Sequence, residues 1–315
     1  MTLTQLAYIL AVNKFRHFGK AAKSCFVTQP TLSMQLQKLE DELGVVIFDR
    51  SKSPILATPE GERIINQARV VIREEKRLLD LVQQSKDELA GEFRLAVIPT
   101  LSTYILPLFL QEFIQKHPKL DLIIEETKTE EIVGMLAEDQ MDAGLLVTPL
   151  NDEALIERAL FYEPFYLFVA PEHPLAKRKK IREDDLDLKE IWLLNKGNCF
   201  RDQVLNICSE RKEEQEVGGS IRFESGNLET LKNMVLTSSG YTVLPHLAVS
   251  QLSAQRRKLI REFQPPVPTR EVSLVYARSV LKERVIDALE ETILEKLPRA
   301  LEAVDPRDVE VVEIS

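Results

Sequence analysis

The 315-residue sequence predicts a small helical domain, then a long helix, and then a larger α/β domain. Apolar residues recur at helical spacing up to about residue 90, whereas strand and helix patterns alternate from about residue 92. Residues 60–90, between these regions, contain no proline. A chain of this length is sufficient for two or three domains with separate cores.

The composition is that of an ordinary globular protein, 44% hydrophobic and 29% charged, with a formal net charge of −9. This acidic total does not indicate a nucleic-acid partner, so any basic surface must be local. No apolar run approaches the length of a membrane span, and the apolar start lacks the flanking features of a signal peptide. Three cysteines without an export signal favour the cytoplasm, where disulfides are usually transient and regulatory.

The first 57 residues are expected to form three helices. Apolar spacing predicts the first two over residues 3–15 and 18–25. Thr28 is suited to cap the third helix, and Gly44 is suited to end it. A short helix, a turn and a longer helix are typical of a helix-turn-helix.

The third helix has two unlike faces. Leucines share one face, and Thr31, Gln35 and Lys38 share the other. Gln can read adenine edges, while hydroxyl groups and Lys bind base edges or phosphates. Residues 11–40 carry five Lys and Arg against one acidic residue, which gives a local basic surface. The alternative is a small helical bundle whose polar face is only solvated.

A wing is predicted over residues 45–57, and it carries two further basic side chains. The candidate DNA-binding residues are Gln29, Pro30, Thr31, Ser33, Gln35, Lys38, Arg50 and Lys52.

Residues 58–91 are predicted to form a linker helix, with Thr58 as N-cap, Pro59 at the first helical position and Gly91 at the end. Its apolar stripe comprises Ile64, Ile65, Val71, Ile72, Leu78, Leu79 and Val82. A long helix with such a stripe needs a partner. That partner is either a second copy, which makes the segment a dimerisation helix, or the helix's own domain.

From residue 92 the alternation of strands and helices indicates an α/β fold with a parallel sheet. The strands are predicted at 93–98, 120–125, 143–147, 165–170, 191–194, 221–224, 241–244 and 272–276. The helices are predicted up to 116 and at 130–138, 199–208, 228–236 and 281–297. Residues 301–315 are acidic, lack a core pattern and are expected to be a mobile tail.

Two of the three cysteines, Cys199 and Cys208, lie in a stretch without Gly or Pro that Asn198 can cap as a helix. In a helix their sulfurs are about 13 Å apart along the axis and point to opposite sides. A disulfide needs Cα atoms within about 7 Å, so a bond between them would require the helix to unwind. This is the physical description of a redox switch. Two unrelated buried thiols would give the same spacing.

The two thiols are expected to differ in chemistry. Cys199 lies at the helix N-terminus, where the helix dipole and Arg201 favour a thiolate. Cys208 has no such help and is expected to be the resolving thiol. Asp202 either orients the site or is an ordinary helix-terminus carboxylate.

Two threonines follow predicted strands at their carboxyl ends, where ligands bind in α/β folds. They are Thr100 and Thr129. Both could instead be simple N-caps.

Several motifs resemble known regulators. The DNA-binding signature of LysR-type transcription factors is similar to Ala21-Ala22, Thr28-Gln29-Pro30-Thr31-Leu32-Ser33, Leu39-Glu40, Leu43-Gly44, Phe48 and Arg50. Cys25 stands where that signature usually has leucine, which implies a buried apolar position. The sensing segment of the OxyR group of peroxide-responsive regulators, within the same family, resembles Cys199-Phe200-Arg201-Asp202-Gln203 with Cys208 and residues 228–235. Asn198 and Arg222 stand where this resemblance leads us to expect histidine.

The LysR-type resemblance covers about residues 1–300 and implies a domain plan. An all-α winged helix-turn-helix domain at 1–57 and a linker helix at 58–91 precede an α/β effector domain at 92–300. The effector domain is expected to contain two periplasmic-binding-protein-like subdomains, at 92–163 plus 268–300 and at 164–267.

The OxyR resemblance implies hydrogen peroxide as the signal and a reversible Cys199–Cys208 disulfide. It also implies that Thr100 and Thr129 line a peroxide pocket beside Cys199. The expected partners are double-stranded promoter DNA of oxidative-stress genes, a second copy in a dimer or tetramer, RNA polymerase, and a cellular thiol reductant. We expect an activator with no membrane partner, no cofactor and no metal.

Two other functions are compatible with the same residues. One is a LysR-type regulator that responds to a small metabolite, in which the cysteines are incidental. The other is a thiol peroxidase that uses Cys199, although a DNA reader at the N-terminus argues against an enzyme. Loss of two thiols on mild peroxide treatment separates the first alternative from a peroxide sensor.

Overall fold

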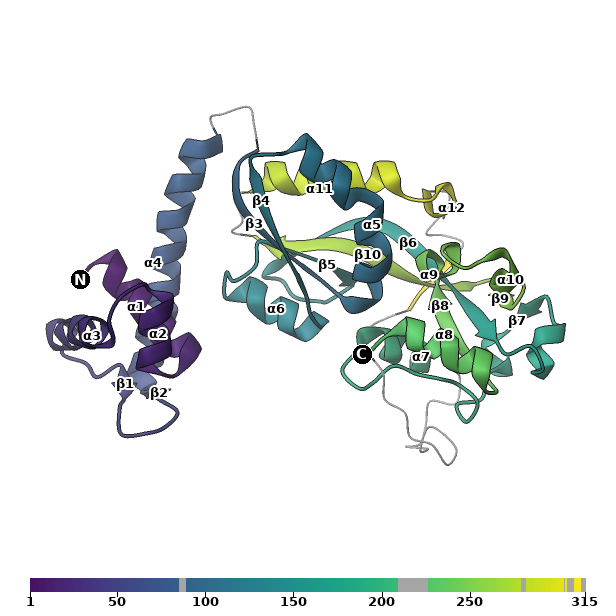
Figure 1. Ribbon diagram of the computed structural model, residues 1–315, viewed down its shortest axis with the longest axis horizontal. Helices are drawn as coiled ribbons and strands as arrows, with labels where there is room; N and C mark the ends of the chain where they lie inside the picture. The colour runs from purple at the N-terminus through teal and green to yellow at the C-terminus, as the bar shows by residue number, and fades with distance from the viewer. Residues whose placement is uncertain (85–88, 209–225, 279–281, 303, 305–308, 313–315) are drawn as a thin grey trace. The chain divides into compact units, whose positions relative to one another are not determined.

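The computed structural model describes residues 1–84, 89–208, 226–278, 282–302, 304 and 309–312 (Figure 1). The chain divides into two compact units, Met1–Asp87 and Glu88–Ser315. No helix in the described part of the chain is long and apolar enough to cross a membrane.

The first unit is a helix-turn-helix with a small wing. Its helices are α1 (Leu3–Phe15), α2 (Phe18–Ser24) and α3 (Gln29–Leu43), and the wing pairs β1 (Phe48–Asp49) with β2 (Leu56–Ala57) antiparallel. Thr28 caps α3 by accepting a hydrogen bond from the backbone N–H of Thr31, and Gly44 ends the helix in the left-handed conformation. The predicted fold class of this region is confirmed.

The wing is fixed to α3 by a buried carboxylate. Glu40 Oε1 accepts hydrogen bonds from the backbone N–H groups of Ile47 and Phe48, at 2.7 and 3.2 Å. Its Oε2 accepts one from Arg50 at 2.6 Å. Burying a carboxylate is costly unless it is paired and hydrogen-bonded, and here both conditions are met.

The long helix α4 (Pro59–Gln84) begins against this wing. Ile65 is buried in the core of the first unit, and Ile64, Val71 and Ile72 pack at its edge. Leu78, further along, is 65% exposed. The first part of the apolar stripe therefore packs on its own domain, while the side chains of Leu79 and Val82 lie outside the described residues.

The described part of α4 covers less than the predicted segment. It ends at Gln84, and residues 85–88 lie outside the described part of the chain. Gly91 is not a helix terminator but the first residue of a strand.

The second unit contains one continuous mixed sheet in the order β4-β3-β5-β10-β6-β9-β7, with β8 paired to β6 and β11 to β10. Three parallel strands, β3 (Gly91–Val97), β4 (Leu120–Glu126) and β5 (Ala143–Thr148), alternate with α5 (Pro99–Lys116) and α6 (Thr129–Ala137). Helix α11 (Glu283–Lys296) packs beside α5.

Two long antiparallel strands, β6 (Leu155–Val169) and β10 (Val267–Ala277), continue the sheet. Up to Pro164, β6 pairs with β10. From Phe165 it pairs with β8 (Tyr241–Pro245), and it also pairs with β9 (Ile260–Phe263). The predicted α/β fold is confirmed, but its sheet is mixed, because these two strands run through both halves of the unit in opposite directions.

The half of the second unit that contains β8 and β9 carries the shorter elements. These are β7 (Lys180–Ile181), α7 (Cys199–Ile207), α8 (Leu228–Thr237), α9 (His246–Ser250), α10 (Ala254–Arg257) and 3-10 turns at Pro174–Lys177 and Glu183–Asp185. The predicted strand at 191–194 is described only as isolated bridge residues, Ile191, which pairs with Tyr241, and Leu194. The strand predicted at 221–224 lies outside the described residues.

The C-terminal segment differs from the expected mobile tail. Helix α12 (Arg299–Glu302) is followed by β11 (Val309–Val311), which pairs in parallel with β10. Val312 is buried, and its backbone N–H donates to the Thr269 carbonyl at 2.8 Å. The valines of this segment supply the core contacts that its acidic residues obscure in the sequence.

Candidate functional site

Helix α7 holds the two cysteines at its opposite ends. Cys199 is its first residue, and Asn198 caps it by accepting a hydrogen bond from the Phe200 backbone N–H at 3.1 Å. Cys208 is the C-cap residue. Both cysteines are buried and not disulfide-bonded, and nine helical steps separate them by about 13 Å along the axis.

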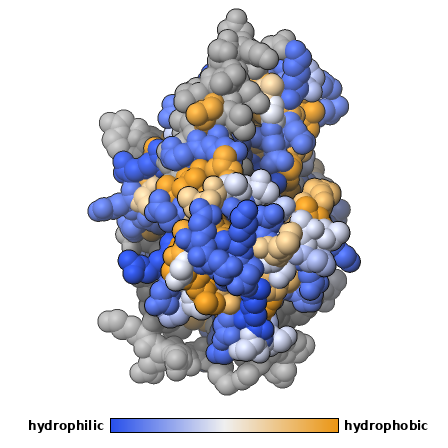
Figure 2. Space-filling model, turned by 90° about the vertical axis from the view of Figure 1, so that its left-hand side faces the viewer, coloured by the Kyte–Doolittle hydropathy of each residue, from blue (hydrophilic) through white to orange (hydrophobic). Residues whose placement is uncertain are grey.

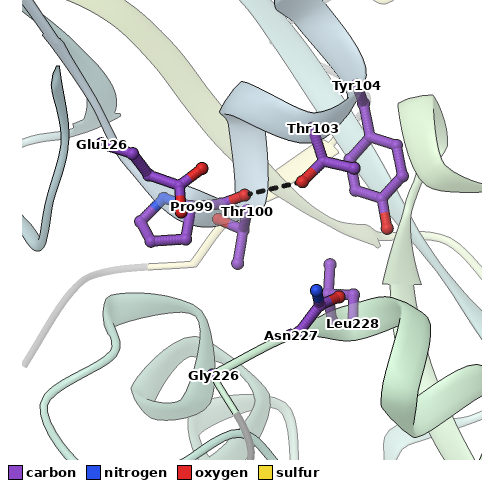
Figure 3. A pocket seen from close by; sticks show the side chains of 8 residues that line it. All are labelled: Pro99, Thr100, Thr103, Tyr104, Glu126, Gly226, Asn227 and Leu228. Carbon is purple, nitrogen blue, oxygen red and sulfur yellow. Dashed lines mark hydrogen bonds between the residues drawn. The ribbon is translucent and has the colours of Figure 1, made fainter.

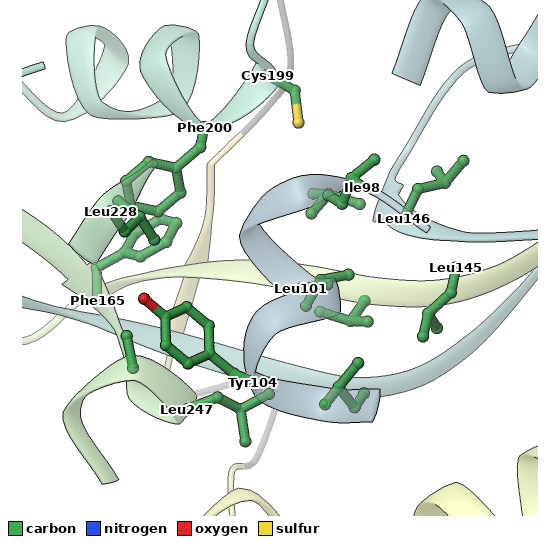
Figure 4. Close-up of a cluster of buried hydrophobic side chains, with 14 of the residues drawn as sticks. Ile98, Leu101, Tyr104, Leu145, Leu146, Phe165, Cys199, Phe200, Leu228 and Leu247 are labelled. Atoms are coloured by element: carbon green, nitrogen blue, oxygen red, sulfur yellow. The ribbon is translucent and has the colours of Figure 1, made fainter. Parts of the chain in front are cut away.

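Cys199 belongs to a buried cluster that also contains Ile98, Leu146 and Phe200 (Figure 4). The Phe200 ring packs edge-on against Phe165, with ring centroids 5.4 Å apart. This apolar setting raises the pKa of the Cys199 thiol, because burial disfavours the thiolate. The resting thiol is therefore held in its protonated form.

Three groups oppose the effect of burial on Cys199. The Thr129 hydroxyl, the charge of Arg270 and the Phe200 backbone N–H all lower the thiol pKa. Thr129 is the first residue of α6, and apart from its effect on the Cys199 thiol its buried Oγ1 has no hydrogen-bond partner among the described residues. A polar group close to the thiol and otherwise unpaired is available to a small ligand or to the thiolate.

The cation near the thiol is held by a buried ion pair. Arg270 on β10 and Glu163 on β6 are both 0% exposed, and Arg270 Nη2 lies 2.7 Å from Glu163 Oε2. Arg270 Nη1 donates to Thr100 Oγ1 at 3.1 Å, and its guanidinium lies over the Phe200 ring. Glu163 Oε1 also accepts the backbone N–H of Leu247 at the start of α9. One network thus connects α5, both long strands, α7 and α9.

Sequence reasoning missed Arg270 and Glu163. Their only local signal is a charged residue at a position that sheet periodicity assigns to the core. The side chain that was expected near Cys199, Arg201, instead donates to the Leu194 carbonyl at 2.8 Å. Arg201 does lower the pKa of the neighbouring Asp202, which partial burial and Glu130 raise.

A cavity of about 270 Å³ lies beside this network (Figure 3). Its residues come mainly from the N-terminal turns of α5 and α8, and they are Pro99, Thr100, Thr103, Tyr104, Glu126, Gly226, Asn227 and Leu228. Across it, Tyr104 donates to Glu229 at 2.8 Å, and Glu229 also pairs with the buried Lys232. Thr100 lines the cavity, whereas Cys199 does not.

The predicted DNA-binding residues lie on α3 and the wing. Gln29, Pro30, Thr31, Lys38, Arg50 and Lys52 are exposed, and Ser33 and Gln35 are half-buried. Gln35 Oε1 accepts a hydrogen bond from Gln5 at 3.3 Å, and Arg50 is bound to Glu40. Cys25 is half-buried at the edge of the core, and Arg222 lies outside the described residues.

Both units match known family descriptions. Residues 3–62 match the bacterial regulatory helix-turn-helix protein, lysR family, and residues 86–298 match the LysR substrate binding domain. The chain belongs to the LysR family, and it is a DNA-binding transcriptional regulator rather than an enzyme.

Its relatives include regulators named for peroxide. The chain is 36% identical over 276 residues to the hydrogen peroxide-inducible genes activator of Dickeya chrysanthemi, which covers 88% of this chain and 89% of that one. The DNA-binding transcriptional dual regulator OxyR of Escherichia coli K12 gives the same identity and coverage. A full-length OxyR variant from Pseudomonas aeruginosa superposes with a TM-score of 0.76 at 35% identity, covering 94% and 99% of the two chains.

Proposed function

We propose that this regulator senses hydrogen peroxide through a reversible Cys199–Cys208 disulfide, and that oxidation changes its binding to promoters of oxidative-stress genes. The observation that carries the proposal is the placement of two buried thiols at opposite ends of one short helix. The names of the relatives support the choice of signal.

The proposed chemistry is two successive displacements. The Cys199 thiolate attacks one peroxide oxygen, the O–O bond breaks, and hydroxide leaves as water after taking up the thiol proton. This step gives a sulfenic acid at Cys199. The Cys208 thiolate then attacks that sulfur, a second water leaves, and the disulfide forms. Peroxide takes two electrons, and a cellular thiol reductant returns them later.

The side chains around Cys199 are assigned roles in the first displacement. The unpaired Thr129 hydroxyl can donate to the thiolate or to peroxide, and Thr100 is oriented by Arg270. Asp202, whose pKa is raised, lies in the same first turn of α7 and can exchange a proton. Arg201 fixes the segment before the helix through Leu194.

The output requires partners beyond the described chain. We propose that two or more copies bind double-stranded promoter DNA as a dimer or tetramer through α3 and the wing. RNA polymerase is the proposed partner of the DNA-bound regulator. The exposed Leu78 on α4 supports α4 as a self-association surface.

Replacing each cysteine by Ser tests the division of roles. Cys199→Ser should not respond to peroxide, because it lacks the nucleophile. Cys208→Ser should form a sulfenic acid at Cys199 but no internal disulfide. Mass spectrometry after brief peroxide exposure, with Cys25→Ser as the matched control, measures both products. Equal sulfenic labelling in the Cys199 and Cys208 variants would contradict the assignment.

A second function is favoured by one observation, the 270 Å³ cavity. Its size and polar rim suit a small metabolite, which a LysR-type regulator would bind with the cysteines incidental. Retention of all three thiols after mild peroxide treatment, with DNA binding unchanged by peroxide, would favour this second function.

A further inference from the structure

Phe26 has an unusual position in the turn between α2 and α3. Its side chain is 96% exposed, although it is large and apolar. Its backbone is in the left-handed region, with φ 55°, which bulky residues rarely adopt. Neither burial nor backbone preference explains a phenylalanine here.

The hydrogen bonds of this turn show which residue type it normally takes. Cys25 is the C-cap of α2, the Phe26 N–H donates to the Lys23 carbonyl, and the Val27 N–H donates to the Ala22 carbonyl. These two bonds define a Schellman motif with Phe26 at its left-handed position. That position favours glycine or asparagine, so a phenylalanine there costs the fold backbone strain.

The surroundings of Phe26 are basic and belong to the DNA reader. The first acidic residue of the chain is Glu40, whereas Lys14, Arg16, Lys20, Lys23 and Lys38 precede it. Lys20 and Lys23, on the helix that this turn ends, are exposed. Figure 2 shows apolar residues exposed among hydrophilic ones on the face of the molecule seen there.

We propose that Phe26 is a DNA contact, and that its ring packs on the apolar groups of the duplex, the thymine methyl groups and deoxyribose. It lies two residues before Thr28, the N-cap of α3, and the N-terminal end of a recognition helix is the part that meets base edges. The left-handed backbone directs the ring away from the core of the first unit. This inference rests on DNA binding by the helix-turn-helix and is independent of peroxide sensing.

DNA fits this surface better than a protein partner does. A protein interface needs a contiguous apolar patch, whereas the exposed residues next to Phe26 along the chain are polar, with Lys20 and Lys23 before it and Thr28 and Gln29 after it. A polyanion with apolar edges matches both the positive charge and the ring.

The test uses the full-length reduced protein and duplexes selected by it from a random-sequence library. Phe26→Gly and Phe26→Asn should weaken binding by about 5- to 30-fold, because the burial of the aromatic ring against DNA is lost. Their Tm should equal or exceed that of the wild type, because both residues suit the left-handed position. Phe26→Tyr, which keeps the ring, should retain wild-type affinity.

A thymine-to-deoxyuridine scan of the selected duplex separates the two apolar groups. If the ring meets a methyl group, one deoxyuridine should weaken the wild type and leave Phe26→Gly unaffected. If it meets deoxyribose, Phe26→Gly should lose the same factor on every duplex. Unchanged affinity of Phe26→Gly and Phe26→Asn, or a change confined to self-association, would overturn the proposal. Asp139→Gly, which relieves a left-handed backbone in the second unit, is the matched control.

Discussion

At the Cys199 thiol, burial and hydrogen bonding act in opposite directions. Burial raises the thiol pKa, and Thr129 is the first of the groups that lower it. Thr129→Val keeps the shape of the side chain but removes the hydroxyl. We expect it to raise the thiol pKa further and to slow oxidation of Cys199 by roughly 2- to 10-fold at neutral pH, the worth of one hydrogen bond. Stopped-flow measurement of sulfenic acid formation checks this, with the exposed Thr103→Val as control.

The same pKa shift predicts the pH dependence. The oxidation rate should rise with pH through the elevated pKa of Cys199, and the Thr129→Val curve should lie at higher pH. A thiol whose folded pKa is raised binds its proton more tightly in the folded state. Its contribution to stability is therefore complete below the unfolded pKa of about 8.5 and is lost as pH rises through the folded value. Superimposable pH profiles for the two proteins would exclude a hydrogen bond from Thr129.

The residues of the site were only partly predictable. Asn198, Cys199 and Cys208 could be found because capping and spacing are local in the sequence. The pairing of Arg270 with Glu163 could not, because it joins strands 107 residues apart. Phe26 could not be predicted for another reason. Glycine is the usual sign of a left-handed turn position, and a phenylalanine there gives no such sign.

At the scale of elements, the junction of α4 with the wing depends on one glycine. A Cβ atom at Gly61 would lie 2.1 Å from the Ile47 carbonyl oxygen, so α4 and the wing approach too closely for any side chain. Gly61→Ala should destabilise the first unit by about 1–3 kcal/mol through overpacking. Thermal unfolding of the full-length chain measures this.

The matched control is another helical glycine, Gly134 in α6. Nothing lies within 4 Å of a Cβ atom there, so Gly134→Ala should stabilise its helix by about 0.5–1 kcal/mol. If both substitutions shift Tm in the same direction, the close approach at Gly61 is not what determines the choice of residue.

The elements themselves were predicted unevenly. The short parallel strands and the helices between them could be predicted from local patterns, because each of these elements has one complete apolar run between turn signals. Strand β6 could not, because it crosses two halves of the sheet and its first part, from Leu155 to Pro164, mixes polar and apolar residues without a regular period. The role of Gly61 was not predictable either, because its missing side chain matters only through the close approach of Ile47 on the wing side.

At the scale of the whole molecule, the proposed sensing mechanism requires that oxidation at α7 be transmitted to DNA. The disulfide cannot form on an intact helix, so α7 must unwind, and its buried Phe200, Val204 and Ile207 must change their packing. Each such side chain is worth about 1.5–3 kcal/mol, and together they match the difference between two global conformations. We expect a subdomain or dimer interface to shift. The linker helices should then change the distance between the two helix-turn-helix domains of the dimer.

Two measurements on the same samples test this transmission. Amides of residues 200–207 should lose hydrogen-exchange protection on oxidation, and footprints of reduced and oxidised protein on one promoter should differ in length or register. Unchanged exchange in protein shown to contain the disulfide would refute unwinding. Changed exchange with identical footprints would break the proposed link to DNA.

The last described strand, β11, also bears on when helix α7 is completed during synthesis. Gln203, inside α7, is fully buried and donates from Nε2 to the Val312 carbonyl at 2.9 Å, so α7 is held by a residue 109 positions later. A ribosome adds about 5–20 residues per second, and this contact therefore becomes available roughly 5–20 s after α7 has been synthesised. The DNA reader is complete long before then. A nascent or C-terminally clipped chain therefore contains the complete helix-turn-helix while its cysteine helix still lacks the hydrogen bond from Gln203 to Val312.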